Sequence, residues 1–411
     1  MMKTKTHSGL APATGHLLSA ALIALIAGSA CSKGATPAQP QLQIEQLPLA
    51  AAAPSLAPQL TVSGDRAVVS WLETQDRTAL LKFSERSGSG WSEPRTVASG
   101  DDWFVNSADV PSVTRLDDGT LAAHWLENIE GGEEAYDLRL AFSKDDGRTW
   151  TAPVSPHHDG TKTEHGFASL FQAPGAGVGL VWLDGRAVVK ENDNMSLRAA
   201  VFDRNGAQQS ETLLDDRVCD CCPTAMAITS GGPIAAFRDR SAGDVRDIAV
   251  SRLVAGQWTA SKTVHDDGWR IAACPVNGPA ISASGRTVVV AWMTGTDDRG
   301  KAFAAFSQDA GATFGAPIRL DNGTSLGRVG VTLLDDGSAF ASWVEFTERA
   351  QLRIRWIERG GARGAARTIA GLGSERTSGY PRLVRHGREL LLAWTESSNG
   401  QSVVRTAAGR W

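Results

Sequence analysis

The stretch Leu121-Ala122-Ala123-His124-Trp125-Leu126-Glu127 is a mostly apolar run that ends on an aromatic residue and, two positions later, an acid. This ending or a close variant occurs seven times along the 411 residues, as Trp71-Leu72-Glu73, Trp125-Leu126-Glu127, Trp182-Leu183-Asp184, Phe237-Arg238-Asp239, Trp292-Met293-Thr294, Trp343-Val344-Glu345 and Trp394-Thr395-Glu396. Consecutive copies are about 54 residues apart, which is the size of one propeller blade. Such a unit cannot bury its apolar face alone, so the repeat predicts an all-β, seven-bladed β-propeller with a central funnel.

Each unit reads as four strands joined by turns that are rich in Asp and Gly. The last unit ends at Trp411 after its third strand, which leaves one outer place open in its sheet. The alternating stretch from Leu42 to Leu47 could fill that place. We therefore expect a single propeller domain over residues 42–411, closed by its N-terminal strand.

One turn has the form S-x-D-x-G-x-T-W at Ser143 to Trp150, and it recurs with Phe as the last residue at Ser307 to Phe314. A hairpin of this kind needs Gly at a positive-φ position, an Asp that accepts backbone amides and an aromatic residue that seats the turn on the blade. These residues are expected to fold the turn and to take no part in chemistry.

The two turns match the Asp-box, or BNR, repeats of the sialidase superfamily, and the resemblance runs from about residue 59 to the end of the chain. A narrower resemblance to bacterial sialidase-like lipoproteins rests on three stretches: Val218-Cys219-Asp220-Cys221-Cys222, Phe237-Arg238-Asp239-Arg240-Ser241 and Cys274-Pro275-Val276-Asn277-Gly278-Pro279. Sialidases usually have six blades, which is the alternative to the seven counted here. The turn motif is specific for the fold and says little about activity.

Sialidases use a Tyr nucleophile paired with a Glu, an Asp acid/base and three Arg that bind the substrate carboxylate. By this resemblance Tyr380, at the start of the last inner strand, is the candidate nucleophile, and Arg328 is the candidate carboxylate ligand. Glu345 is the candidate partner of Tyr380 because its blade is adjacent. The F/Y-R-I-P tetrapeptide of the family is absent. Hydrolysis of a sialoside-like bond is therefore one hypothesis, and a non-catalytic module that binds a ligand or a partner is the other.

Acids and arginines gather in the loops expected around the funnel. The repeated aromatic residue at the end of each apolar run is called the anchor. Six units carry an acid two residues after it: Glu73, Glu127, Asp184, Asp239, Glu345 and Glu396. Each acid lies on the same strand face as its anchor, where it either accepts structural hydrogen bonds or takes part in proton transfer. Arg186, Arg238 and Arg240 lie beside Asp184 and Asp239. Guanidinium forks suit an anionic ligand such as an acidic sugar, and the Asp–Arg pairs could equally satisfy one another.

Four cysteines fall in equivalent loops of consecutive units: Cys219, Cys221, Cys222 and Cys274. In an exported chain an even number favours disulfides, and four cysteines allow three connectivities. Cys222 with Cys274 is the natural bond between blades, which leaves Cys219 with Cys221 as a tight second pair. On this interpretation the chain needs no metal or other cofactor. The alternatives are a soft-metal site, where the thiolates and His165 hold copper or zinc, and free thiols.

The N-terminus has the order of an export signal: Lys3 and Lys5, an apolar stretch from Leu17 to Ala27, then small residues. The apolar stretch is too short to span a bilayer. Gly28-Ser29-Ala30-Cys31 resembles a bacterial lipobox, although Gly28 stands where Leu is usual. We therefore predict a lipoprotein signal over residues 1–31 with Cys31 acylated; a conventional cleavage site is the alternative.

The Ala-, Pro- and Gln-rich residues 32–41 predict a flexible tether. The predicted location is thus the bacterial cell envelope, with the lipid as the only membrane contact. The net charge is −4 and the pI is about 6.1, so charge offers no reason to expect nucleic acid as a partner. The expected ligand is an anionic carbohydrate or another small anion.

Overall fold

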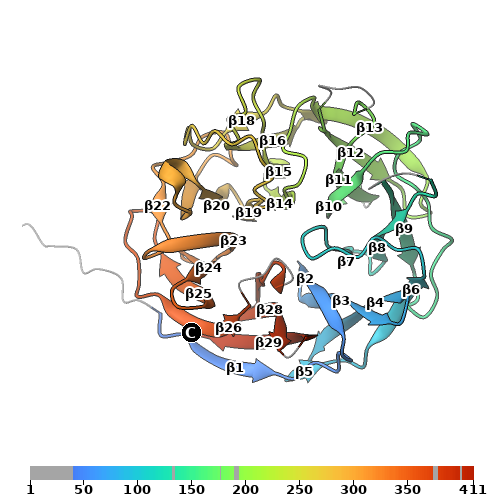
Figure 1. The fold of residues 1–411 in the computed structure, drawn as a ribbon, viewed down its shortest axis with the longest axis horizontal. Helices are drawn as coiled ribbons and strands as arrows, with labels where there is room; N and C mark the ends of the chain where they lie inside the picture. Colours follow the sequence, from blue (N-terminus) through green and yellow to red (C-terminus); the bar gives the residue numbers. More distant parts are fainter. Residues whose placement is uncertain (1–39, 132–134, 176, 189–193, 374–377, 399) are drawn as a thin grey trace, which may run out of the picture. The chain divides into compact units, whose positions relative to one another are not determined.

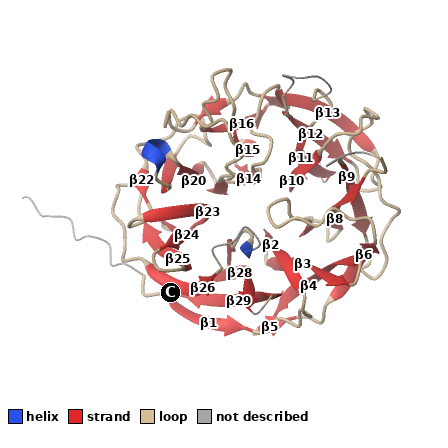
Figure 2. Ribbon diagram, in the orientation of Figure 1, coloured by secondary structure: helices blue, strands red, loops and turns tan. Residues whose placement is uncertain are grey.

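The structure is a computed structural model, and it describes residues 40–411 apart from 132–134, 176, 189–193, 374–377 and 399. In this part of the chain seven antiparallel sheets stand around one axis, each as one blade (Figure 1). Strands and loops make up nearly all of the ring, and the 3-10 helix η1 (Thr296–Asp298) is a short exception (Figure 2). The predicted all-β, seven-bladed propeller is confirmed, and the six-bladed alternative is wrong.

The blades follow one another in chain order. The first three consist of β2 (Ser55–Ser63), β3 (Arg66–Gln75), β4 (Thr78–Ser87), β5 (Gly90–Trp91) and β6 (Arg95–Gly100); then β7 (Ser112–Arg115), β8 (Leu121–Asn128) and β9 (Tyr136–Ser143); then β10 (His165–Ala173), β11 (Gly177–Asp184), β12 (Ser196–Phe202) and β13 (Gln208–Asp215).

The next three blades consist of β14 (Ala225–Thr229), β15 (Gly232–Arg238), β16 (Ile248–Val254), β17 (Gln257–Trp258) and β18 (Lys262–Thr263); then β19 (Ala280–Ser284), β20 (Thr287–Thr294), β21 (Lys301–Ser307) and β22 (Ile318–Arg319); then β23 (Thr324–Leu333), β24 (Ala339–Phe346), β25 (Ala350–Ile357) and β26 (Arg367–Leu372). Apolar side chains between adjacent sheets form the core, with one cluster of buried residues after another around the ring. Among the described residues no helix is long and apolar enough to cross a bilayer.

The seventh blade joins the two ends of the propeller. Its strands are β27 (Arg382–His386), β28 (Glu389–Ser398), β29 (Gln401–Arg410) and, at the outer edge, β1 (Gln43–Leu47). β1 pairs with β29 in an antiparallel ladder from Gln43–Arg410 to Leu47–Thr406. The stretch from Leu42 to Leu47 thus occupies the outer place that the last unit leaves open.

The repeated aromatic-acid pattern has a local structural cause. In four blades the acid accepts a hydrogen bond from the indole Nε1 of the Trp two residues earlier, at 2.7 to 2.9 Å: Trp71–Glu73, Trp125–Glu127, Trp182–Asp184 and Trp343–Glu345. In the fifth blade Thr294 replaces the acid, and Trp292 donates to Asp267 from a neighbouring loop instead. A buried indole N–H needs an acceptor, so these acids have a structural role in those four blades.

The two S-x-D-x-G turns form the same set of hydrogen bonds. Asp145 accepts from the backbone N–H and the hydroxyl of Thr149, at 2.9 and 2.7 Å, and Gly147 adopts a φ of 78°. The hydrogen bond from the Thr149 backbone is the main reason why the pKa of Asp145 falls to about 2. Asp309 and Thr313 repeat the arrangement at 2.8 and 2.6 Å. These turns stabilise the outer ends of their blades and lie outside the funnel.

Three inner strands bulge where they enter the funnel. The register shifts between Leu56 and Gln59 in β2, between Gly166 and Ser169 in β10, and between Gly327 and Gly330 in β23. Each bulge holds one non-glycine residue with φ between 51° and 55°: Ala57, Phe167 and Arg328. Left-handed backbone is unfavourable for such residues and is often found at functional sites. Here it places Phe167 and Arg328 in the wall of the funnel mouth.

Candidate functional site

A cavity of about 720 Å³ opens at the mouth of the funnel. Loops and strand ends of six blades contribute to its wall, including Tyr136, Glu164, Asp220, Cys221, Arg328 and Tyr380. The chain has only two tyrosines, and both line this cavity. A concave site of this size with several polar groups is the usual form of a small-ligand site.

Tyr136 and Asp109 form a hydrogen-bonded pair in the wall. The Tyr136 hydroxyl donates to Asp109 Oδ2 at 3.2 Å, and the backbone N–H of Phe167 donates to Asp109 Oδ1 at 2.7 Å. Phe104 stacks on the Tyr136 ring with 4.1 Å between the ring centroids. Strand β9 and the bulge of β10 therefore hold the phenol and the carboxylate in one orientation.

Gly166 makes this pair possible. A Cβ atom at position 166 would lie 2.0 Å from Asp109 Oδ2 and 2.7 Å from the Tyr136 ring. Both distances are far below van der Waals contact, so any side chain here would push the carboxylate and the phenol apart. The close approach explains why glycine stands at this position in the bulged strand.

Burial, with a smaller contribution from nearby Glu164, raises the pKa of Asp109 to about 7 against the lowering effect of the hydrogen bonds from Phe167 and Tyr136. Burial also raises the pKa of Tyr136 well above its ordinary value. Asp109 therefore changes charge near neutral pH, where the Tyr136 phenol keeps its proton, and the carboxylate is the proton acceptor of the pair.

Asp109 should make stability depend on pH in a direction that can be measured. Since its folded-state pKa lies above the unfolded value of 3.8, its contribution is complete below pH 4 and is lost as the pH rises through 7. The expected slope is about 1.4 kcal/mol per pH unit in this window. Urea unfolding at several pH values should show a shallower slope for Asp109→Asn than for the unmodified protein. Equal slopes would contradict the raised pKa.

Tyr380, the predicted nucleophile, is buried beneath a loop. Its hydroxyl donates to the backbone oxygen of Val276, and burial raises the pKa of Tyr380 above its ordinary value. Glu345, its predicted partner, accepts from Trp343 Nε1 at 2.7 Å and from the Asn322 backbone at 3.3 Å. No hydrogen bond joins Glu345 to Tyr380 among the described residues. Glu345 and Tyr380 therefore do not form the predicted pair. The Glu345 carboxylate is hydrogen-bonded to the indole of Trp343 instead.

Arg328 lies where the sequence placed it, in the wall of the funnel. Its backbone N–H donates to Asn277 Oδ1 at 2.8 Å, which fastens the bulge of β23 to the loop of the preceding blade. Gly327 precedes it with a φ of 74°, and a Cβ there would lie 2.0 Å from the same Asn277 oxygen. Arg328 in β23 therefore lines the same cavity as Tyr136 in β9, from a different blade.

The other predicted ligand arginines do not line this cavity. Arg238 is 1% exposed and donates to three backbone oxygens. Arg186 forms two hydrogen bonds to Asp184, at 2.7 and 2.8 Å. Arg240 Nε donates to Asp244 at 2.9 Å, and its backbone N–H donates to Asp239 at 2.7 Å. The ligand role predicted for Arg186, Arg238, Arg240, Asp184 and Asp239 is not supported, since their hydrogen bonds are made to groups of the protein itself.

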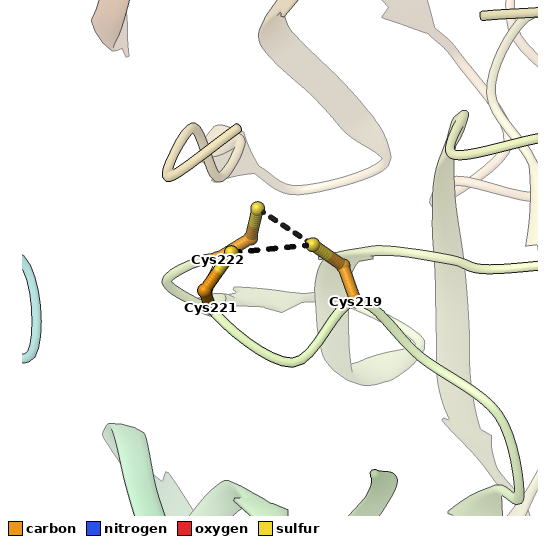
Figure 3. Close-up of side chains that lie close together, drawn as sticks. All are labelled: Cys219, Cys221 and Cys222. Carbon is orange, nitrogen blue, oxygen red and sulfur yellow. Dashed lines mark hydrogen bonds between the residues drawn. The ribbon is translucent and has the colours of Figure 1, made fainter. Parts of the chain in front are cut away.

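The cysteine pairing differs from the prediction. The structure has a disulfide between Cys221 and Cys274, and Cys219 and Cys222 are buried free thiols. The predicted Cys222–Cys274 and Cys219–Cys221 bonds are both wrong. Burial gives the reason: Cys219 and Cys222 lie side by side in the interior, at 0% and 1% exposure, whereas Cys221 is half-buried and Cys274 is exposed. Figure 3 shows the sulfur of Cys219 next to those of Cys221 and Cys222. Alignment of the repeats placed Cys222 opposite the partner blade, but it could not show which cysteine side chains face the interior.

The donor atoms test the soft-metal alternative. Three sulfurs, those of Cys219, Cys221 and Cys222, lie within 4.8 Å of one another. Cys221 is bonded to Cys274, however, and a disulfide sulfur is not a thiolate ligand. The Cys219 and Cys222 sulfurs are 2.9 Å apart, closer than the ~3.5 Å or more between two thiolates bound to one zinc ion. In this disulfide state the residues do not fit copper or zinc, and His165 lies outside the cluster.

His165 belongs to a second group of possible ligands, between the second and third blades. Its ring stacks on His157 with centroids 3.6 Å apart, and its Nε2 lies 3.2 Å from Asp159 Oδ2 and 3.9 Å from Asp184 Oδ2. Arg186 Nε lies 2.7 Å from the other oxygen of Asp184. This guanidinium already neutralises the carboxylate that a cation would need, so the group fits an ion-pair network better than a metal.

The structure resembles propellers of several solved enzymes. Polysaccharide lyase Uly1 superposes with a TM-score of 0.52 at 10% identity, over 86% of this chain and 89% of that one. A variant of the NanB sialidase from Streptococcus pneumoniae gives 0.47 at 10% identity, over 84% and 83% of the two chains. An α-L-arabinanase from Penicillium chrysogenum gives 0.48 at 13% identity, over 75% and 94%. The likeness is one of fold. No family model matches the sequence, and no curated protein matches it.

Three residues at the mouth were not predicted from the sequence: Asp109, Tyr136 and Glu164. One signal was available, because Tyr136 is one of only two tyrosines in the chain. Asp109 carried no signal of its own. It reaches Tyr136 across 27 positions and Phe167 across 58, and only the packing of neighbouring blades creates those contacts.

Proposed function

We propose that the funnel mouth binds an anionic carbohydrate and cleaves a glycosidic bond, with Tyr136 as the attacking group and Asp109 as its base. The hydrogen bond between the Tyr136 hydroxyl and Asp109 carries this proposal. A phenol with a raised pKa is a weak nucleophile by itself, and a carboxylate within 3.2 Å is the group that activates it.

In the proposed step Tyr136 Oη attacks the anomeric carbon and its proton passes to Asp109. The bond to the leaving sugar breaks, and Glu164, which lines the same cavity, gives a proton to the leaving oxygen. Water then attacks the glycosyl-tyrosine, with Glu164 as base, and the proton on Asp109 returns to the phenolate. Both carboxyl groups recover their starting state.

Three features support a carbohydrate with a negative charge. The Phe104 and Tyr136 rings and the polar side chains of the wall offer apolar and hydrogen-bonding contacts, as sugars require. Arg328 supplies the positive charge for a carboxylate or a sulfate. The sialidase-like turns and the fold shared with Uly1, which is named a polysaccharide lyase, agree with this ligand class.

The predicted export signal and Cys31 lie outside the described residues. They are the basis for the location that we propose for the protein. We infer that the protein acts at the bacterial cell envelope, held by lipid on Cys31 and reaching its ligand through residues 32–41. Metabolic labelling with a fatty-acid analogue, with Cys31→Ser as the control, tests this. Equal labelling of the two proteins would contradict the anchor.

Tyr136→Phe is expected to lower kcat at least about 100-fold on any fluorogenic acidic glycoside that the parent protein cleaves. Tyr380→Phe is the matched control, since it removes the other hydroxyl of the same cavity, and it should change kcat less than about threefold. Equal losses, or a loss in the control alone, would contradict the assignment. Binding without turnover in the parent protein would favour a non-catalytic module.

The rate should also depend on pH. Asp109 can accept the phenol proton only when it is ionised, so kcat/KM is expected to rise as the pH increases through about 7. In Asp109→Asn, most of the activity and the rise of kcat/KM with pH should both be lost. A rate that falls over the same range would contradict the role of Asp109 as a base.

A further inference from the structure

Two cysteine pairs lie one behind the other at the rim of the funnel. The outer pair is the Cys221–Cys274 disulfide, which lines the cavity; Cys274 is exposed and Cys221 is half-buried. The inner pair is Cys219 and Cys222, at 0% and 1% exposure, with 2.9 Å between their sulfurs. Cys219 Sγ lies 3.9 Å from Cys221 Sγ, so the pairs are in contact (Figure 3).

We propose that the inner dithiol and the outer disulfide form a thiol–disulfide relay that passes two electrons between the buried pair and thiols or disulfides that reach the funnel mouth. The motif supports this. Within Cys219-Asp220-Cys221-Cys222 the inner pair has the C-x-x-C spacing of dithiols that close into a disulfide.

The surroundings of Cys219 favour its thiolate. Arg246 Nη1 lies 3.3 Å from Cys219 Sγ, and Arg246 is itself 3% exposed. The hydrogen bond with Cys222, with smaller contributions from Arg238 and Arg246, lowers the pKa of Cys219 to about 6. Burial raises the pKa of Cys222 well above its ordinary value. Cys219 is therefore the sulfur that attacks first, and Cys222 remains a protonated thiol until the second step of the exchange.

The exchange balances without a further reactant. The Cys219 thiolate attacks Cys221 Sγ, a Cys219–Cys221 bond forms, and Cys274 leaves as a thiolate that takes a proton. Cys222 then loses its proton and attacks Cys219 Sγ, and Cys221 leaves. One disulfide has replaced another, and two electrons have moved from the inner pair to the outer pair. A disulfide outside the protein, such as glutathione disulfide, can then accept them from Cys274 and Cys221.

The loops of the two blades are built to hold this arrangement. The Asn277 backbone N–H donates to Cys222 Sγ at 3.4 Å, and a Cβ on Gly278 would lie 2.0 Å from the Pro223 oxygen. Val276 has a φ of 46° between Cys274 and these contacts. The inner pair is thus closed from solvent, and its sulfurs contact the cavity wall through Cys221 of the outer disulfide.

Labelling of Cys274 on the folded protein tests the relay. Tryptic cleavage after Arg270 and Arg286 releases residues 271–286, in which Cys274 is the only cysteine, so its label is unambiguous. The full chain is first shown to carry one disulfide among these four cysteines by counting thiols after denaturation. The folded protein is then exposed to N-ethylmaleimide without reductant. The relay releases Cys274 transiently, so maleimide should trap it.

Cys219→Ser removes the attacking sulfur and should reduce the labelling rate of Cys274 at least about tenfold. Cys222→Ser keeps Cys219 and should still be labelled, which makes it the matched control. The rate in the unmodified protein should rise as the pH increases through about 6, where Cys219 ionises. An unlabelled Cys274 in the unmodified protein, or equal labelling in Cys219→Ser, would overturn the relay. Should Cys219→Ser fail to fold, the pH dependence in the unmodified protein decides: a flat profile overturns the proposal.

Discussion

Deletion of residues 1–48 is expected to lower the free energy of unfolding by at least about 5 kcal/mol relative to deletion of residues 1–39. The longer deletion removes β1, whose ladder with β29 closes the ring. It also removes Leu42 and Leu47, which are 4% and 6% exposed. Each buried leucine contributes roughly 1.5–3 kcal/mol, and each ladder hydrogen bond about 0.5–1.5 kcal/mol.

The two leucines explain why the effect should exceed that of an ordinary edge strand. Leu42 belongs to the apolar cluster between the sixth and seventh blades, and Leu47 to the cluster between the seventh and the first. Loss of β1 therefore weakens two junctions and leaves β29 as an open edge, which favours association between chains. Urea unfolding gives the free energy, and sedimentation gives the association state. Equal unfolding curves for the two deletions would show that β1 is not needed for closure.

Arg238→Met is expected to lower the free energy of unfolding by about 3–5 kcal/mol. The guanidinium is fully buried and donates to the backbone oxygens of Asn277, Arg246 and Met293, at 2.8, 2.5 and 2.7 Å. It also lies over the Trp269 ring, 4.9 Å from the centroid. In the variant, three buried backbone carbonyls lose their charged hydrogen-bond donor. Methionine fills the volume of the arginine but replaces none of its hydrogen bonds.

Arg240→Met is the matched control for Arg238→Met, two residues further along the chain and with the same chemical change. The Arg240 side chain is 25% exposed and pairs with half-exposed Asp244, so its loss should change stability by less than about 1 kcal/mol. A comparable loss in the two variants would contradict the structural role of Arg238. Lower affinity for an acidic sugar with unchanged stability would restore the ligand role that the sequence suggested.

The number of blades was predictable because the pattern that encodes it is local. A Trp and an acid two residues later lie on one face of one strand, so the indole and the carboxylate meet whatever the rest of the chain does. The turn at Asp145 is local in the same way, since the side-chain hydrogen bonds of Ser143 and Asp145 lie within seven residues. Such contacts repeat with the sequence, and their spacing gives the architecture.

The site was predictable only in outline. Repeat alignment brought Arg328, Tyr380 and the cysteine loops to one mouth, because equivalent positions of a ring meet around its axis. It could not decide which side chains face one another there. Tyr380 turns under the loop that contains Val276, and Arg238 turns into the protein. Both orientations depend on loops whose conformation has no periodic pattern in the sequence.

The sequence by itself determined the sevenfold ring, its aromatic anchors and the turns of its outer edges, because neighbours within a few residues make those contacts. Only the tertiary structure decided that Asp109 meets Tyr136, that Cys221 bonds to Cys274, and that Cys219 faces Cys222 in the interior. These pairings depend on bulges and loop turns, where a rotation of one residue exchanges the side chain that faces the funnel for the one that faces the core.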